Sequence, residues 1–274
     1  MSARAEHAAA LDKVIAIAEE AAHLIRGIYE QGNLDVEYKG KDDPVTRADK
    51  AANTLIVERL SAAFPGSPIV AEESDPATWA GHERADRVFF VDPLDGTQEF
   101  VRRSGEFAVM IGMIEAGRPV LGVVTRPLPF VTYAGGPGLG AFLLEGGVRM
   151  PISVHTARNL SEADVVISRS HRSPEIDAAL AKLGAKNLIP YGSAGLKAIK
   201  VATGEVDLYA QTQNAGKRWD SCAPEAIVVG AGGILTDAKG KLLDYRTVEL
   251  GNVDGVLSGP PETHRQALVR LGYG

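Results

Sequence analysis

Hydrophobic residues recur at three- and four-residue intervals in two segments near the start of the chain. The first pattern runs from Leu11 to Ile28 and the second from Ala52 to Ala63. This spacing places apolar side chains on one face of a helix, so both segments are predicted to be amphipathic helices. Gly32 is expected to end the first helix, and Pro65-Gly66 to end the second.

Short apolar runs predict strands. Ile69–Ala71 reads as one short strand and Val88–Val91 as a buried one. Between Phe107 and Leu144, β-rich runs are separated by groups of turn-forming residues, which predicts an antiparallel meander of hairpins. These turns are expected at Glu115 to Arg118, Pro127 to Pro129 and Gly135 to Gly138.

The pattern changes near residue 150, where strand-like and helix-like segments begin to alternate. Strands are expected at 165–167 and 206–210, and helices at 174–183, after Ser193, and at about 221–229. Such alternation is typical of an α/β arrangement. We therefore expect an α+β domain over residues 1–150 and an α/β domain over residues 151–274.

Composition narrows the class of protein. The 274 residues are 45% hydrophobic, enough for a sizeable core, yet no stretch approaches the roughly 20 apolar residues of a membrane span. The N-terminus carries Glu6, Asp12 and Lys13 and does not resemble a signal peptide, so a soluble, cytoplasmic protein is expected. The single cysteine, Cys222, excludes an internal disulfide framework and a cysteine-rich zinc site, and is expected to be a buried packing residue.

The net charge of −6 argues against binding to a nucleic-acid polymer or to an anionic membrane. An anionic small molecule could still bind through metal ions. Acidic residues gather in four short segments, and two of these follow predicted strands. The segments are "DPVTRAD" (43–49), "AEES" (71–74), "VDPLDGT" (91–97) and "RWDSCA" (218–223).

Glu72 and Asp92 directly follow strands, where functional sites commonly form. The Pro-Leu-Asp-Gly sequence has turn chemistry, which is expected to fold Asp92 and Asp95 toward one point. Neighbouring carboxylates repel one another unless a cation lies between them. Oxygen ligands suit Mg²⁺ or Mn²⁺. A lone acid of this kind is most often a turn residue or solvated, but the combination favours a metal site.

The motifs "EE", "DPLDGT" and "WDSCA", in this order after "DPVTRAD", resemble those of the lithium-sensitive, Mg²⁺-dependent phosphatases. That superfamily contains the inositol monophosphatases and the 3'(2'),5'-bisphosphate nucleotidases. The resemblance extends from Lys39 to about Gly259. It implies a layered αβαβα sandwich and a site with two or three Mg²⁺ ions, Mn²⁺ being possible, and it implies inhibition by lithium.

The resemblance also implies roles for individual residues. Four carboxylates and one carbonyl would hold the metals: one ion would be bound by Glu72, Asp92 and the Leu94 carbonyl, and a second by Asp92, Asp95 and Asp220. Asp49 and Thr97 would orient and deprotonate the attacking water. Glu73 is expected to lie behind the ligands or to be solvated. Gly96 is expected to allow a tight turn and to begin a helix whose N–H groups face the phosphate.

Other segments resemble the nucleotidase branch: "DGTQEF" followed by "GEFAV", "ISRSH", and "GSAGLK". They place Ser168, His171, Ser193 and Lys197 at nucleotide-contacting positions, with a helix from Ser193 offering N–H donors to a second phosphate. A helix cap, a solvated lysine and a surface histidine would equally explain these residues. Gln98 departs from the pattern, because the nucleotidases usually carry lysine there.

The sequence thus predicts a Mg²⁺-dependent phosphatase that removes the 3'-phosphate of adenosine 3',5'-bisphosphate, giving AMP and phosphate. The partner is a small phosphate ester, and the chain is expected to be a monomer or homodimer. Two alternatives stay open. One is an inositol monophosphatase or broad sugar-phosphate phosphatase. The other is a catalytically silent nucleotide-binding sensor, which would not require Asp49 and Thr97.

Overall fold

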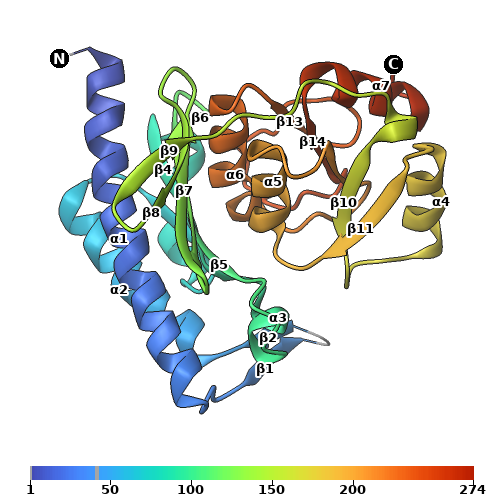
Figure 1. Ribbon diagram of the computed structural model, residues 1–274. Coiled ribbons are helices and arrows are strands. Elements are labelled where there is room, and N and C mark those ends of the chain that lie inside the picture. The colour runs from blue at the N-terminus through green and yellow to red at the C-terminus, as the bar shows by residue number, and fades with distance from the viewer. Residues whose placement is uncertain (1, 41–42) are drawn as a thin grey trace.

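The structure is a computed structural model that describes residues 2–40 and 43–274. It is built from five layers, which alternate between helices and sheets (Figure 1). Helices α1 (Ala3–Gln31) and α2 (Arg47–Ala63) cover one face of a seven-stranded sheet, and α5 (Ala194–Ala202) and α6 (Trp219–Gly230) lie between this sheet and a five-stranded one. Helices α4 (Pro174–Lys182) and α7 (Pro261–Leu271) form the outer layer. The predicted αβαβα sandwich is confirmed.

The first two helices are confirmed and end where the sequence predicts, but both begin earlier than their apolar patterns, which start at Leu11 and Ala52. Ser2 caps α1, and Gly32 ends it in the left-handed conformation with φ of 82°. Thr46 and Asp49 form a reciprocal capping box at the start of α2. The Thr46 hydroxyl accepts a hydrogen bond from the Ala48 N–H, and the Asp49 carboxylate accepts one from the Thr46 N–H. The apolar faces of both helices pack on the sheet.

The seven-stranded sheet has the order β3-β4-β5-β6-β7-β8-β9, and all neighbours are antiparallel except β3 and β4. The predicted hairpins from Phe107 to Leu144 are confirmed. The strands are β3 (Ile69–Ala71), β4 (Arg87–Asp95), β5 (Ala108–Glu115), β6 (Arg118–Pro127), β7 (Phe130–Gly136), β8 (Gly140–Glu145) and β9 (Val148–Pro151). A separate two-stranded pair consists of β1 (Glu37–Gly40) and β2 (Asp43–Val45).

Strand β4 is apolar throughout its first half because both of its faces are covered. Val88 and Phe90 pack on the α5–α6 side, whereas Phe89 and Val91 pack on the α1–α2 side. A strand buried on both faces reads as a continuous apolar run instead of an alternating one. This explains the sequence that precedes Asp92.

The five-stranded sheet has the order β11-β10-β12-β14-β13. Strand β10 (Asp164–Ser168) pairs in parallel with β11 (Asn187–Tyr191) and β12 (Leu208–Gln211), so Ser168, Tyr191 and Gln211 all lie at carboxyl ends of strands. The remaining strands are β13 (Ile234–Thr236) and β14 (Val256–Gly259). Short helices complete the described chain: α3 (Thr97–Val101) and the 3₁₀ turns Pro76–Trp79, His82–Arg84 and Leu160–Glu162.

One hydrophobic cluster fills the space between the two sheets. It contains Phe90 and Met110 from the larger sheet, Ile199 and Ile227 from α5 and α6, and Tyr209 from the smaller sheet. Because this core is shared, the division into domains at residue 150 stays a prediction, although the larger sheet does end at Pro151. None of the described helices is long and apolar enough to span a membrane.

Candidate active site

The end of β4 brings its two aspartates together through a β-bulge. Asp92 pairs with Met110 of β5 and Asp95 pairs with Ala108, so three steps along β4 match two steps along β5. Side chains alternate between the faces of a regular strand, which would put residues three apart on opposite faces. The extra residue in β4 reverses this and lets both carboxylates face the same pocket. Both aspartates are therefore part of β4, where the sequence predicted a turn following the strand.

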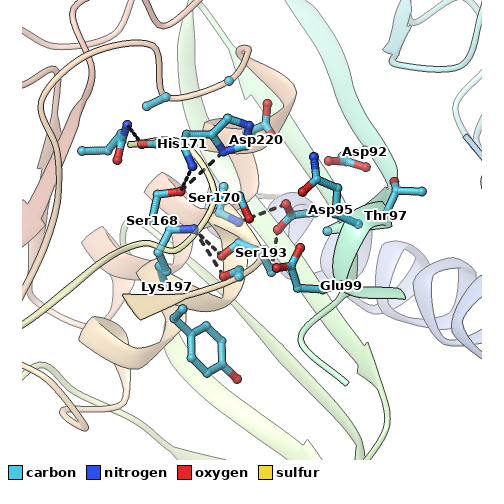
Figure 2. A pocket seen from close by; sticks show the side chains of 18 of the residues that line it. Asp92, Asp95, Thr97, Glu99, Ser168, Ser170, His171, Ser193, Lys197 and Asp220 are labelled. Atoms are coloured by element: carbon cyan, nitrogen blue, oxygen red, sulfur yellow. Dashed lines mark hydrogen bonds between the residues drawn. The ribbon is translucent and has the colours of Figure 1, made fainter. Parts of the chain in front are cut away.

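The pocket has a volume of about 200 Å³ and lies where β4, α3, α5 and α6 meet the carboxyl ends of the parallel strands. Figure 2 shows the side chains that line it, with Asp92 and Thr97 on one side and Ser168 and His171 on the other. All of the residues predicted from the sequence to form the site line this pocket except Asp49, which lies behind Thr97.

Asp92, Asp95 and Asp220 form a compact acidic cluster. Each offers a carboxylate oxygen, and the three oxygens lie within 4.8 Å of one another. Burial and the charges of Glu72, Asp220 and Asp95 raise the pKa of Asp92 well above its usual range. Burial, together with Asp95 and Glu72, does the same to the pKa of Asp220. Three ionised carboxylates this close repel one another strongly, so a positive charge between them would be stabilising.

The cluster fits a hard divalent cation on the chemistry of its donors. All the donor atoms are carboxylate oxygens, and Leu94 lines the same pocket. Oxygen ligands of this kind suit Mg²⁺, Mn²⁺ or Ca²⁺ and not zinc or copper. Glu72 is not among the three clustered residues, although it lines the pocket; its carboxylate lies 3.6 Å from Lys39 Nζ. Glu73 also forms an ion pair with Lys39.

Asp95 is held in place by the beginning of α5, as the dashed lines of Figure 2 show. The Ser193 hydroxyl and the Gly195 N–H donate to Oδ2, the latter at 2.7 Å, and the Ala194 N–H donates to Oδ1 at 3.0 Å. A carboxylate is stabilised at a helix N-terminus by these donors and by the helix dipole. Asp95 therefore joins the larger sheet to the start of α5 through three hydrogen bonds, whose donors lie about a hundred residues later in the sequence.

This arrangement corrects one expectation. The N–H groups at the start of α5 were expected to bind a second phosphate, but Asp95 accepts two of them and the Ser193 hydroxyl accepts that of Leu196. Lys197 is 4% exposed, and its Nζ donates to the carbonyls of Gly192 and Ser193. Burial lowers the pKa of Lys197, although Asp95 and Glu99 oppose that effect. Substrate contact by Ser193 and Lys197 stays a prediction.

Asp49 and Thr97 form a second connected pair. Thr97 Oγ1 donates to Asp49 Oδ1 at 2.9 Å and also lies 3.1 Å from the Leu94 carbonyl oxygen. The other Asp49 oxygen accepts from the N–H and the hydroxyl of Thr46. Burial raises the pKa of Asp49 above its usual value, with the bonds from Thr46 and Thr97 acting in the opposite direction. Asp49 is consequently a better proton acceptor than an exposed aspartate.

Gly96 occupies a position that only glycine fits. Its φ is 91°, and an added Cβ would lie 2.7 Å from the Glu106 carbonyl oxygen. It caps α3, which begins at Thr97, so the predicted tight turn and helix start are confirmed. Cys222 is fully buried, as expected of a packing residue.

The wall opposite the acidic cluster is polar and largely uncharged. His171 is held by its N–H, which donates to Ser168 Oγ at 3.1 Å. Gln211 is 2% exposed and donates its amide hydrogens to the carbonyls of His171 and Gln213, at 3.1 and 2.9 Å. Its side-chain oxygen is buried and has no hydrogen-bond partner among the described residues. Buried acceptors without a partner are uncommon in folded proteins.

Comparison with known proteins identifies the family. Residues 7–270 match the inositol monophosphatase family. The chain belongs to this family. Among curated relatives, the 3'(2'),5'-bisphosphate nucleotidase CysQ of Salmonella typhimurium is 43% identical over 86% of this chain and 93% of the relative. The CysQ nucleotidase of Escherichia coli strain K12 is 40% identical over the same shares.

Solved structures of the family agree with the fold. The extragenic suppressor protein SuhB of Bartonella henselae superposes with a TM-score of 0.83, at 26% identity, over 97% of this chain and 99% of that one. An IMPase of Thermotoga maritima gives a TM-score of 0.80 at 28% identity, over 96% of each chain. The family resemblance read from the motifs is therefore confirmed over nearly the whole chain.

Several residues that line the pocket were not predicted from the sequence. These are Gln211, Tyr191, Tyr209, Ser170, Glu99 and Asn214. Ligands of α/β sheets bind outside the carboxyl ends of the strands, and that rule could have identified Gln211 and Tyr191 together with Ser168. Thr46 was also missed, although Thr-x-x-Asp before an apolar run is a capping-box signal.

Proposed function

We propose that this protein is a metal-dependent 3'(2'),5'-bisphosphate nucleotidase that converts adenosine 3',5'-bisphosphate to AMP and phosphate. The observation that carries the proposal is the 43% identity to a CysQ bisphosphate nucleotidase over 93% of that relative. The acidic pocket supports it, because phosphate monoesters are hydrolysed very slowly without catalysis and oxygen-bound cations are effective catalysts of that reaction.

Mg²⁺, or Mn²⁺ in its place, would be held by the carboxylates of Asp92, Asp95 and Asp220, with Glu72 and the Leu94 carbonyl as further ligands. When bound, such ions supply positive charge to the phosphate oxygens and lower the pKa of a water molecule. Asp95 is fixed by the start of α5 and Asp92 Oδ1 by the Leu94 N–H at 2.9 Å. The carboxylates are therefore preorganised by their own chain.

Thr97 and Asp49 would position the attacking water and take up its proton. Because the Thr97 hydroxyl donates to Asp49, its oxygen lone pairs are available to accept a hydrogen bond from water in the pocket. As the water attacks the phosphorus, Thr97 receives its proton and passes its own to Asp49. The raised pKa of Asp49 favours that transfer.

The nucleoside part would lie against the wall formed by Ser168, His171 and Gln211. Hydrogen-bond donors and acceptors there suit ribose hydroxyls and a base edge. The ligand is a small phosphate ester, with neither a nucleic-acid polymer nor a membrane as partner. We further propose a cytoplasmic location and a monomeric or homodimeric state.

A second candidate is an inositol monophosphatase. One observation favours it: among the described residues that line the pocket there is no arginine, and the one lysine, Lys197, is buried against backbone carbonyls. A neutral polyol would require no further cation, whereas a second phosphate would benefit from one.

Identification of the products tests the proposal. With Mg²⁺, purified enzyme should convert adenosine 3',5'-bisphosphate to 5'-AMP and phosphate in equal amounts, as followed by chromatography, and EDTA should stop the reaction. Release of adenosine 3'-phosphate, or no product at all, would exclude the proposed reaction.

A further inference from the structure

Three chain segments meet beside the pocket and are joined by one arginine and two glutamates. Arg169 follows β10, Glu106 precedes β5, and Glu99 lies in α3. Arg169 donates to both oxygens of Glu106, from Nη1 to Oε2 at 2.6 Å and from Nη2 to Oε1 at 2.7 Å. Two parallel charge-assisted bonds of this kind are both strong and directional.

The same glutamate also binds a fourth segment, which contains Gly192. The Gly192 N–H donates to Glu106 Oε2 at 2.6 Å, immediately before Ser193 and the start of α5. The Arg169 bonds and the Gly192 bond together keep the pKa of Glu106 below its usual value, although partial burial acts in the opposite direction. Glu106 therefore connects the α3 side of the pocket to two segments of the smaller sheet.

Glu99 extends the network from within the protein. It is 4% exposed, and its Oε1 makes no hydrogen bond within the described part of the chain but lies 3.5 Å from Arg169 Nη1 and 3.7 Å from Arg102 Nη1. Arg102 Nη1 in turn lies 3.4 Å from the Ser170 hydroxyl. Both glutamates thus face the guanidinium of Arg169, which makes this arginine the common partner of the network.

Gly192 shows how closely these groups are packed. A Cβ at this residue would lie 2.3 Å from Glu99 Cγ and 2.8 Å from Glu106 Oε2. Such distances are well below ordinary contact, so the backbone at 192 lies directly against both glutamate side chains. Movement of either carboxylate would be transmitted to the backbone of Gly192.

The residues that these bonds hold are pocket residues, whereas Arg169 and Glu106 themselves do not line the pocket. Ser168, Ser170, His171, Gly192 and Ser193 line the pocket. Among the described lining residues neither Arg169 nor Glu106 appears. We propose that Arg169 and Glu106 are positioning residues: their bidentate pair fixes the wall that receives the alcohol part of the substrate, and thereby determines affinity for large leaving groups.

The acidic cluster should be unaffected by loss of this pair. Asp95 is held by Ser193, Ala194 and Gly195 directly, and Asp92 by the backbone of its own bulge. The effect should therefore fall on binding and not on the chemical step, which predicts a raised KM with kcat retained. This inference rests on the proposed function, because it takes a bisphosphate nucleotide as the large substrate.

Steady-state kinetics of Arg169→Gln, Glu106→Gln and the double variant test the proposal, with Mg²⁺ and two substrates. In the proposed function, adenosine 3',5'-bisphosphate reaches the wall formed by Ser168, His171 and Gln211, whereas glycerol 2-phosphate is too small to do so. For the nucleotide, Arg169→Gln should raise KM about tenfold with kcat within about twofold, since charge-assisted hydrogen bonds position the wall. Turnover of glycerol 2-phosphate should stay unchanged, and the double variant should be no worse than the poorer single variant.

Arg265→Gln is the matched control. Arg265 also forms two bonds to one glutamate, Glu262, at 2.8 and 2.7 Å, but in α7 and away from the pocket. Its kinetics should equal those of the unsubstituted enzyme. Arg169→Lys keeps the charge without the bidentate geometry and should give an intermediate KM.

Three results would overturn the proposal: an unchanged nucleotide KM, a fall in kcat at constant KM, or equal losses on both substrates together with a lowered Tm. The last result would mean that the pair stabilises the fold in general. Failure of the proposed function would look different, because the unsubstituted enzyme would then hydrolyse glycerol 2-phosphate but not the nucleotide, or neither.

Discussion

The Thr97 hydroxyl donates a hydrogen bond to Asp49 at 2.9 Å, although the two residues lie 48 positions apart in the sequence. Thr97 opens α3 directly after the bulge of β4, and Asp49 lies in the capping box of α2. A carboxylate in a capping box already satisfies the helix terminus. The other carboxylate oxygen of Asp49 is therefore free to accept the hydrogen bond from Thr97, so α2 and α3 together fix this pair.

Thr97→Ala should lower kcat on the order of a hundredfold or more, because proton transfer by a positioned side chain contributes at least that much to comparable reactions. Stabilisation by Mg²⁺, measured as the rise in Tm on addition of the metal, should be retained, since the carboxylates are unchanged. Thr97→Ser keeps the hydroxyl and serves as the control, with near-normal kcat expected. Unchanged turnover in the alanine variant would refute the role given to Thr97.

Asp92→Asn should make the metal-free protein more stable while abolishing most of its response to Mg²⁺. Burial and three neighbouring carboxylates make the charge of Asp92 costly, as its raised pKa indicates. The amide keeps an oxygen for the Leu94 N–H bond. A gain of about 1–2 kcal/mol is expected in EDTA, from the relief of repulsion between close like charges.

Thermal unfolding in EDTA and in Mg²⁺ measures both effects. Asp12→Asn is the control, because Asp12 is an exposed acid paired with Arg149 and its loss changes the net charge equally. If Asp92→Asn and Asp12→Asn respond alike to Mg²⁺, Asp92 is not a ligand.

The acid sensitivity of the fold should depend partly on His264. This side chain is 4% exposed, its Nε2 lies 2.8 Å from the Thr236 hydroxyl oxygen, and burial lowers the pKa of His264 to about 4. An unfolded histidine titrates near pH 6.5. The folded protein therefore binds fewer protons between these values, and stability contributed by His264 is present above about pH 6.5 and is lost as the pH falls toward 4.

His264→Gln removes the titrating group and keeps a donor for Thr236. The loss of unfolding free energy between pH 7 and pH 4.5 should be smaller in this variant, by roughly 2 kcal/mol from the size of the pKa shift. Chemical denaturation at the two pH values measures the difference. An identical pH dependence in both proteins would show that His264 does not control it.

Local patterns predicted the elements well, because each depends on residues that are close in sequence. The helix end at Gly32 and the hairpins after Phe107 are of this kind. The bulge in β4 was not predicted, since a register shift is defined by pairing with β5 and Pro-Leu-Asp-Gly alone is compatible with a turn.

The carboxylates of the site could be identified from their motifs, but their partners could not. Asp95 accepts bonds from residues 98 to 100 positions later, and these bonds use the N–H donors at the start of α5 that were expected to bind a phosphate. Glu106 and Arg169 are 63 positions apart and carry no local signal. Contacts of this type depend on how the two sheets pack together. Local patterns of hydrophobic and polar residues do not predict that packing.

The most direct measurement is kcat/KM for adenosine 3',5'-bisphosphate and for myo-inositol 1-phosphate, determined side by side in Mg²⁺ with an EDTA control. A bisphosphate nucleotidase should prefer the nucleotide about a hundredfold, which corresponds to roughly 2.7 kcal/mol of differential transition-state binding. A preference for the inositol ester would contradict the nucleotide assignment while leaving the acidic metal site in place, and turnover of neither would point to a binding protein.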